Sequence, residues 1–224
     1  IDSATVVAGL AGVARHEVIA VGPVLESTSP LVSTNKLEQY SGMYDLSGGL
    51  EKTFVPMRNA LFLTIAANRA VCLGLQHLVT GVCQADNANY PDCRGTFIAA
   101  QQHTIQEALG QAGQFSVHAP LMNMSKAQSI ELAVKLGGYH ALAFSHTAYD
   151  GTYPPVSKDH ASVLRAHGFE QAGLPDPLVL RAWHEKLMDL PGTENYADAE
   201  RNRIILQGVE QTSSRLGIGA EAPQ

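Results

Sequence analysis

The sequence predicts an α/β fold, because helical and strand-like segments alternate along the chain and polar loops flank them. A small-residue apolar segment at 60–73 has the character of a buried helix, and the short segment at 77–81 is predicted as a strand. An amphipathic helix over 95–112 and a strand over 115–119 repeat the pattern. Polar side chains lie at both ends of the first helix–strand pair, where α/β proteins usually bind their ligands.

The remaining elements follow from local composition. Residues 22–49 are rich in Ser, Thr, Pro and Gly and predict a long loop. Ser125 is a candidate N-cap of a further helix, and residues 139–149 are predicted as a strand with its exit loop. After a polar break at 191–195 a last helix is expected. The apolar positions of the two C-terminal helices are Leu180, Trp183, Leu187 and Leu190, then Ile204, Ile205, Leu206 and Val209.

The composition argues against several classes of function. The chain has 224 residues, 45% of them hydrophobic, with a formal net charge of −6 and a pI near 5.8. No Lys/Arg cluster is present, so direct binding to nucleic acid is not expected. No apolar run reaches membrane-spanning length, and no membrane association is expected. The three cysteines lack metal-ligand spacing, which predicts free thiols and a cytoplasmic location.

The loop after the strand at 77–81 is dense in functional side chains. Asp86, Tyr90, Asp92 and Arg94 fall within nine positions, and Pro91 stiffens the backbone between them. A carboxylate here is suited to accept two parallel hydrogen bonds from the N1–H and exocyclic amine of a guanine-like base, a geometry that excludes adenine. The alternative is an ordinary Asn/Asp/Pro turn with solvated charges.

Several motifs occur in order along the chain. Thr-Phe-Val-Pro-Met-Arg-Asn at 53–59 precedes the apolar helix, and Gly81-Val82 leads to Tyr-Pro-Asp-Cys-Arg at 90–94. Pro-Leu-Met-Asn-Met-Ser-Lys at 120–126 and the stretch 165–177 follow. Together they resemble the 7-cyano-7-deazaguanine synthase family, the nitrile-forming enzymes of queuosine biosynthesis, within the PP-loop ATP pyrophosphatase superfamily.

The resemblance implies a fold and a reaction. The fold is a three-layer α/β arrangement of the adenine nucleotide α-hydrolase-like type, with a mainly parallel sheet flanked by helices and a helical C-terminal lobe. A PP-loop nucleotide-binding domain is expected over 1–145, and a helical lobe with an extension over 146–224. The reaction is ATP-dependent conversion of 7-carboxy-7-deazaguanine and ammonia into 7-cyano-7-deazaguanine through an acyl-adenylate, with Mg²⁺ at the phosphates. The sequence leaves open whether the product is the nitrile or the 7-amido intermediate.

The resemblance also assigns residues to ATP. Asp2 and Ser3 match the end of a PP-loop, Ser-Gly-Gly-x-Asp-Ser, whose amides wrap pyrophosphate at a helix N-terminus; alternatively they are only N-cap residues. Lys126 is assigned to the phosphates. The helix dipole disfavours a lysine at the N-terminus of a helix, and ATP phosphates would supply the compensating charge. The alternative is an ordinary surface lysine. Arg58 is assigned to the phosphates or the substrate carboxylate. Lys126 and Arg58 are the candidate catalytic residues.

The resemblance implies that the remaining assigned residues bind the deazaguanine base of the substrate. The candidate substrate-binding residues are Asn59, Asp86, Tyr90, Asp92 and Arg94.

Two pieces of the family pattern are missing from the sequence. The Ser-Gly-Gly of the PP-loop would precede residue 1, and a strand–helix unit is missing between Ala11 and His16, just before a strand expected at 16–21. We expect that both belong to the protein and are omitted from this chain, because segments around an empty ATP site would be mobile. A naturally shortened protein is the alternative.

No structural zinc is expected. The resemblance places four zinc-binding cysteines at positions now held by Ala148, Val156, Asp159 and Ser162. Alanine and valine have no donor atom, so a tetrahedral site cannot form from these positions. Packing of Val156 and the stiffness of Pro154-Pro155 are expected to hold the segment instead.

Other functions stay open at this stage. One is adenylation of another carboxylate in nucleic-acid modification or defence. Another is a degenerate paralogue that binds nucleotide without turnover, and a third is an assembly role for the C-terminal helices. The apolar faces of those helices are expected to pack either on the C-terminal lobe or against a second subunit. Of these, a homodimer is the preferred expectation.

Overall fold

The computed structural model describes residues 1–21, 24–46, 48–84, 89–110 and 113–215. They form two compact units. The central unit consists of Pro23–Leu37 and Leu46–Ser125. The C-terminal unit consists of Ile1–Gly22, Glu38–Asp45 and Lys126–Gln224.

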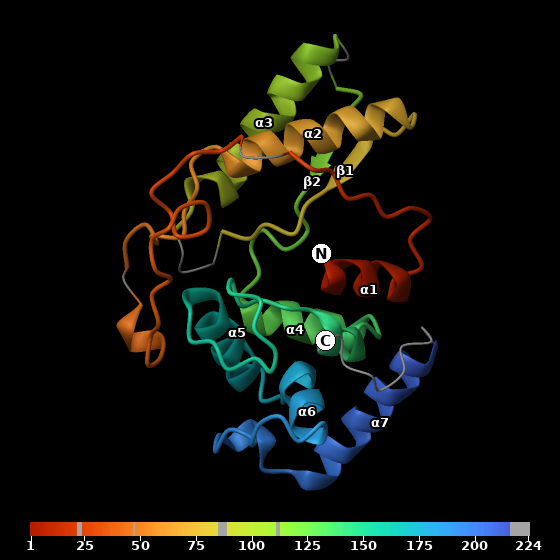
Figure 1. The fold of residues 1–224 in the computed structure, drawn as a ribbon. Coiled ribbons are helices and arrows are strands. Elements are labelled where there is room, and N and C mark those ends of the chain that lie inside the picture. The colour runs from red at the N-terminus through yellow and green to blue at the C-terminus, as the bar shows by residue number, and fades with distance from the viewer. Residues whose placement is uncertain (22–23, 47, 85–88, 111–112, 216–224) are drawn as a thin grey trace. The chain divides into compact units, whose positions relative to one another are not determined.

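The central unit is a small α/β layer. Its elements are α2 (Arg58–Cys72), β1 (His77–Val79), the 3₁₀ turn η2 (Pro91–Cys93), α3 (Gly95–Leu109) and β2 (Ser116–His118). The strands are parallel, with Leu78 opposite Val117, and Figure 1 shows α2 and α3 together beside them. Small residues on one face of α2 let it pack closely against α3 and the sheet. The core residues are Leu63, Ala67, Ala70, Ile98, Ile105, Phe115 and Val117.

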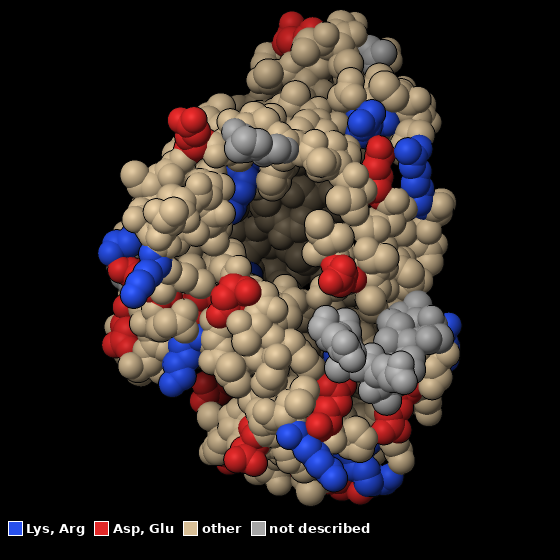
Figure 2. Space-filling view, viewed as in Figure 1, with Lys and Arg blue, Asp and Glu red and all other residues tan. Residues whose placement is uncertain are grey.

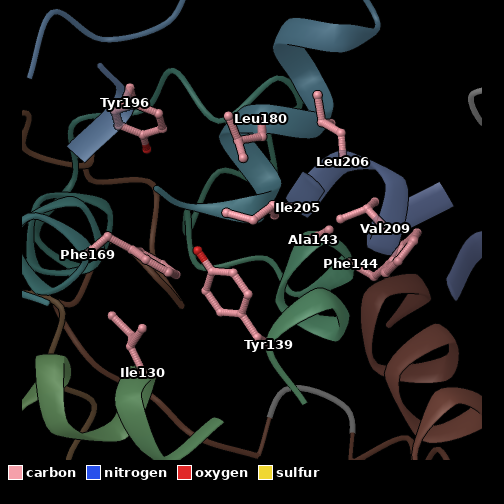
Figure 3. Packing of buried hydrophobic residues seen from close by; sticks show 10 residues of the cluster. All are labelled: Ile130, Tyr139, Ala143, Phe144, Phe169, Leu180, Tyr196, Ile205, Leu206 and Val209. Carbon is pink, nitrogen blue, oxygen red and sulfur yellow. The ribbon is translucent and has the colours of Figure 1, made fainter. Parts of the chain in front are cut away.

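The C-terminal unit is helical. Its elements are α1 (Asp2–Leu10), η1 (Met43–Asp45), α4 (Lys126–Lys135), η3 (Tyr139–Phe144), α5 (His160–Gln171), α6 (Pro177–His184), η4 (Glu194–Tyr196) and α7 (Ala199–Arg215). Figure 3 shows the core where these helices meet. Val6, Val7 and Leu10 of α1 pack against it. At Gly168 the approach of α5 to α4 leaves no room for a side chain, since a Cβ there would lie 2.6 Å from that of Lys126.

Most predicted elements are confirmed. The helices expected at 60–73 and 95–112 are α2 and α3, and the strands expected at 77–81 and 115–119 are β1 and β2. The last predicted helix is α7. The helix containing Leu180 and Trp183 is α6, which ends at His184, before Leu187 and Leu190.

Two predicted strands are wrong. Residues 139–149 begin with η3 instead, and the adjacent Ala143 and Phe144 are both buried, which breaks the alternation of a half-buried strand. The expected strand at 16–21 is absent, because these residues form no regular secondary structure. Among the described residues the parallel sheet has two strands. The three-layer arrangement and the division at residue 145 stay predictions.

Candidate functional site

A tight turn carries Arg58 into position at the start of α2. The amide of Arg58 donates to the carbonyl of Val55 at 3.2 Å, with Pro56 and Met57 as the central residues. Met57 has φ 65° and ψ 5°, which corresponds to the third position of a type II turn, where glycine is favoured. Holding a methionine in this left-handed conformation costs about 1–2 kcal/mol.

The carboxylate of Asp92 is fixed against this helix start. Asp92 is only 7% exposed, and its Oδ2 accepts from the backbone amide of Asn59 at 3.1 Å. The side-chain amide of Asn59 donates in return to the carbonyl of Asp92 at 3.0 Å and to Sγ of Cys93 at 3.3 Å. A carboxylate at a helix N-terminus is favoured by the helix dipole. The 90–94 loop is therefore joined to α2 across 33 residues of sequence.

Tyr90 occupies the same cluster. Its hydroxyl lies 2.5 Å from Oγ1 of Thr53, a residue that is almost completely buried. Its ring lies 5.5 Å from the ring of Phe54, and the guanidinium of Arg58 lies 5.8 Å from the ring centroid. The ring is thus positioned by its hydroxyl and by its contacts with Phe54 and Arg58, which fixes an aromatic group in the cluster.

Two guanidinium groups belong to this loop and turn. Arg58 is half-buried and Arg94 is exposed. Among the described residues, neither side chain makes a hydrogen bond or ion pair. Because a planar guanidinium suits carboxylate and phosphate, both groups are available to an anionic ligand.

The cluster brings together Arg58, Asn59, Tyr90 and Asp92 from the predicted site. Asp86 lies outside the described residues. Thr53 and Phe54 were not selected from the sequence, although both lie in the 53–59 motif. Only the fold reveals their contact with Tyr90, since 37 residues separate Thr53 from it.

Apart from Arg58, which lies in the central unit, the residues assigned to ATP lie in the C-terminal unit. Asp2 is exposed in the first turn of α1, Ser3 is the next residue, and the N-cap Ile1 has no capping side chain. Lys126 is the first residue of α4. Both helices present their N-termini where these residues lie, so backbone N–H groups accompany the side chains.

The segment that aligns with the expected zinc site is organised by a carboxylate. Asp159 is 0% exposed and caps α5 by accepting from the amide of Ser162 at 2.8 Å. It also accepts from the amide of Tyr149 at 2.8 Å and from the hydroxyl of Ser157 at 3.3 Å. The expected packing of Val156 is wrong, because its side chain is 54% exposed.

These residues do not fit zinc. Ala148 and Val156 have no donor atom, and Asp159 is engaged by protein groups, including the amide of Ser162. Among the residues that the structure describes, no group of three His, Cys, Asp or Glu could hold a metal ion.

Arg165 and Asp176 form the main ion pair of the same unit. Nε and Nη2 of Arg165 donate to the two carboxylate oxygens at 2.5 and 2.8 Å. The remaining guanidinium donors reach Ser145, Thr147 and the carbonyl of Leu142. Asp176 also caps α6, and burial together with its charge raises the pKa of Tyr196 well above the usual range.

The described surface carries mixed charge. Figure 2 shows acidic and basic side chains interspersed over the face in view. Within the described part of the chain, no helix is long and apolar enough to cross a membrane.

Comparison with known proteins shows the family to which the chain belongs. A model of the family described as queuosine biosynthesis protein QueC matches residues 1–173. A 7-cyano-7-deazaguanine synthase of Gloeobacter violaceus is 46% identical over 182 residues, covering 80% of this chain and 78% of the relative. One of Laribacter hongkongensis is 41% identical over 181 residues, covering 81% and 77%. The chain belongs to the QueC family.

Proposed function

We propose that this chain is a 7-cyano-7-deazaguanine synthase, which uses ATP to convert 7-carboxy-7-deazaguanine and ammonia into the nitrile. The observation that carries the proposal is the contact of the 90–94 loop with the first turn of α2, which fixes the Asp92 carboxylate in the same cluster as Tyr90 and Arg58. Family membership and the names of the relatives support the same reaction.

Asp92 is proposed to recognise the deazaguanine base through hydrogen bonds. A carboxylate has lone pairs left after it accepts from the Asn59 amide, and these suit the N1–H and exocyclic amine of a deazaguanine. The side-chain N–H groups of Asn59 are used within the cluster, so its carbonyl oxygen is its proposed contribution. Tyr90 supplies the flat surface, and Arg94 and Asp86 complete the frame.

Arg58 is the proposed partner of the substrate carboxylate or of the phosphate that reacts with it. In the first step a carboxylate oxygen attacks the α-phosphorus of ATP, the bond to pyrophosphate breaks, and an acyl-adenylate forms. Ammonia then displaces AMP and loses a proton to give the amide. The amide oxygen then attacks the α-phosphorus of a second ATP, pyrophosphate leaves again, and loss of AMP and two protons gives the nitrile. The protein contributes position and charge neutralisation.

The proposed phosphate ligands are Asp2, Ser3 and Lys126. Ser3 donates a hydroxyl, and Lys126 balances the charge of departing pyrophosphate. Mg²⁺ usually takes one or two protein carboxylates with phosphate oxygens and water. Asp2 suits this role because its side chain is exposed at the helix start. Bound magnesium would neutralise phosphate charge.

The C-terminal lobe is proposed to fold without zinc. The segment around Asp159 receives its hydrogen bonds from protein groups, and the Arg165–Asp176 pair joins η3, α5 and α6. We also propose a cytoplasmic homodimer. Trp183, Leu187 and Ile204 are exposed apolar residues in the C-terminal part of the chain and suit a second copy.

Product analysis tests the proposed reaction. The protein is incubated with ATP, Mg²⁺, ¹⁵N-ammonia and 7-carboxy-7-deazaguanine, and the products are separated by chromatography with mass detection. The expected result is a labelled nitrile formed through a labelled amide. Accumulation of amide alone restricts the enzyme to the first half of the reaction. Absence of both products contradicts the proposal.

A further inference from the structure

Met57 occupies a turn position that favours glycine. Its backbone is left-handed, with φ 65°, and the residue is 67% exposed to solvent. The neighbouring Val55 is 1% exposed and anchors the turn in the core. A strained backbone and an exposed apolar side chain both disfavour methionine here, and strained residues concentrate at functional sites.

The turn places Met57 at the edge of the candidate site. The next residue is Arg58, whose guanidinium lies 5.8 Å from the ring centroid of Tyr90. The residue after that is Asn59, whose amide holds the carboxylate of Asp92 at 3.1 Å. Met57, the N-cap of α2, therefore lies on the same short, hydrogen-bonded segment as these two residues.

The chemistry of the thioether fits a flat heteroaromatic ligand. A methionine side chain is flexible and polarisable, and sulfur makes favourable contacts with aromatic rings. We propose that Met57 is a specificity-determining residue that forms an apolar wall of the deazapurine pocket and strengthens binding of the base. This inference rests on the proposed function, because it takes the base to bind beside Tyr90 and Asp92.

Glycine substitution separates this role from backbone strain. Met57→Gly removes the side chain and relieves the left-handed conformation, so the thermal unfolding midpoint should rise. At the same time Kd and KM for 7-carboxy-7-deazaguanine should increase roughly 2- to 10-fold, while KM for ATP stays unchanged. Met57→Leu retains an apolar side chain and should keep most of the affinity.

Lys186 provides a matched control. It also has a left-handed backbone, with φ 62°, but follows α6 in the other unit and belongs to no proposed site. Lys186→Gly should raise the unfolding midpoint without changing Kd or KM for the base.

Calorimetric titration with 7-carboxy-7-deazaguanine and steady-state kinetics distinguish the outcomes. If Met57→Gly binds the base as tightly as Lys186→Gly, the role of Met57 is wrong while the proposed function stands. If the wild-type protein binds the base but forms no product, weaker binding by Met57→Gly still supports this role, and only the proposed function fails. If the wild-type protein does not bind the base, both are overturned.

Discussion

The arginines of the two units have different surroundings. In the C-terminal unit, Arg165 donates to both oxygens of Asp176 and to three further residues. In the central unit, Arg58 lies over an aromatic ring, and no described residue supplies a carboxylate to it or to Arg94. A cation whose donors are all used holds a fold together. One that retains its donors is available to an anionic ligand.

The largest loss of stability is expected on removal of Arg165, because all of its donors are used within the fold. Arg165→Ala leaves the buried carboxylate of Asp176 without its cation and should lower the free energy of unfolding by about 3–5 kcal/mol. Urea titration measures this. Arg203→Ala, which removes an exposed pair with Glu200, is the control and should change stability little. Equal effects of the two substitutions would show that Arg165 does not organise the unit.

The next effect concerns recognition in the central unit. Asp92→Asn retains an oxygen that accepts from the Asn59 amide, so the loop should stay in place. The variant loses the charge and one acceptor, and kcat/KM for the deazapurine should fall roughly 10- to 150-fold. Steady-state kinetics and the unfolding midpoint are measured together. A wild-type kcat/KM in this variant would remove Asp92 from the base site.

Asp159 is expected to stabilise the C-terminal unit through its buried hydrogen bonds. Asp159→Ala removes an N-cap and leaves the partly buried amide of Tyr149 without its acceptor, so stability should fall by about 1–3 kcal/mol. Asp198→Ala, which removes an exposed acceptor for the Arg201 amide, should cost less, about 0.5–1 kcal/mol.

A chelator tests whether Asp159 or a bound metal ion holds this segment. If Asp159 holds the segment, EDTA should leave the wild-type unfolding midpoint unchanged. A large decrease with EDTA, together with stoichiometric zinc in the purified protein, would contradict a lobe that folds without metal.

The smallest effect is expected from His140. Burial lowers its pKa, and the ring packs so closely on α7 that a Cβ at Gly208 would lie 2.3 Å from Nε2. The folded state disfavours the protonated ring, so this contribution to stability is present above the unfolded pKa of about 6.5 and is lost as pH falls below it. Urea titrations at several pH values should show a smaller loss in His140→Gln. An identical pH dependence in both proteins excludes His140 as a contributor.

The sequence predicted local elements better than the contacts between them. The small-residue and amphipathic patterns located α2 and α3 because helical periodicity is a local property. The short apolar run at 139–144 was misassigned, since such runs fit strand and helix alike. The site required the fold: the bond between Asn59 and Asp92 joins segments far apart in sequence.

The C-terminal lobe shows the same limit. The missing donors at Ala148 and Val156 were evident from residue types. That Asp159 would be completely buried and accept from three groups was not evident, because a lone aspartate has the same sequence signal on a surface as in a core. The left-handed backbone of Met57 was likewise invisible in the sequence.

Release of AMP is the most direct test of the central claim, that Arg58 and Arg94, which have no carboxylate partner among the described residues, belong to a ligand site. Wild-type protein, Arg58→Ala and Arg203→Ala are each given ATP, Mg²⁺ and ammonia with or without 7-carboxy-7-deazaguanine. We expect AMP and pyrophosphate only when the deazapurine is present, with a strong loss in Arg58→Ala and none in Arg203→Ala. Deazapurine-dependent AMP release at the wild-type rate from Arg58→Ala would contradict it.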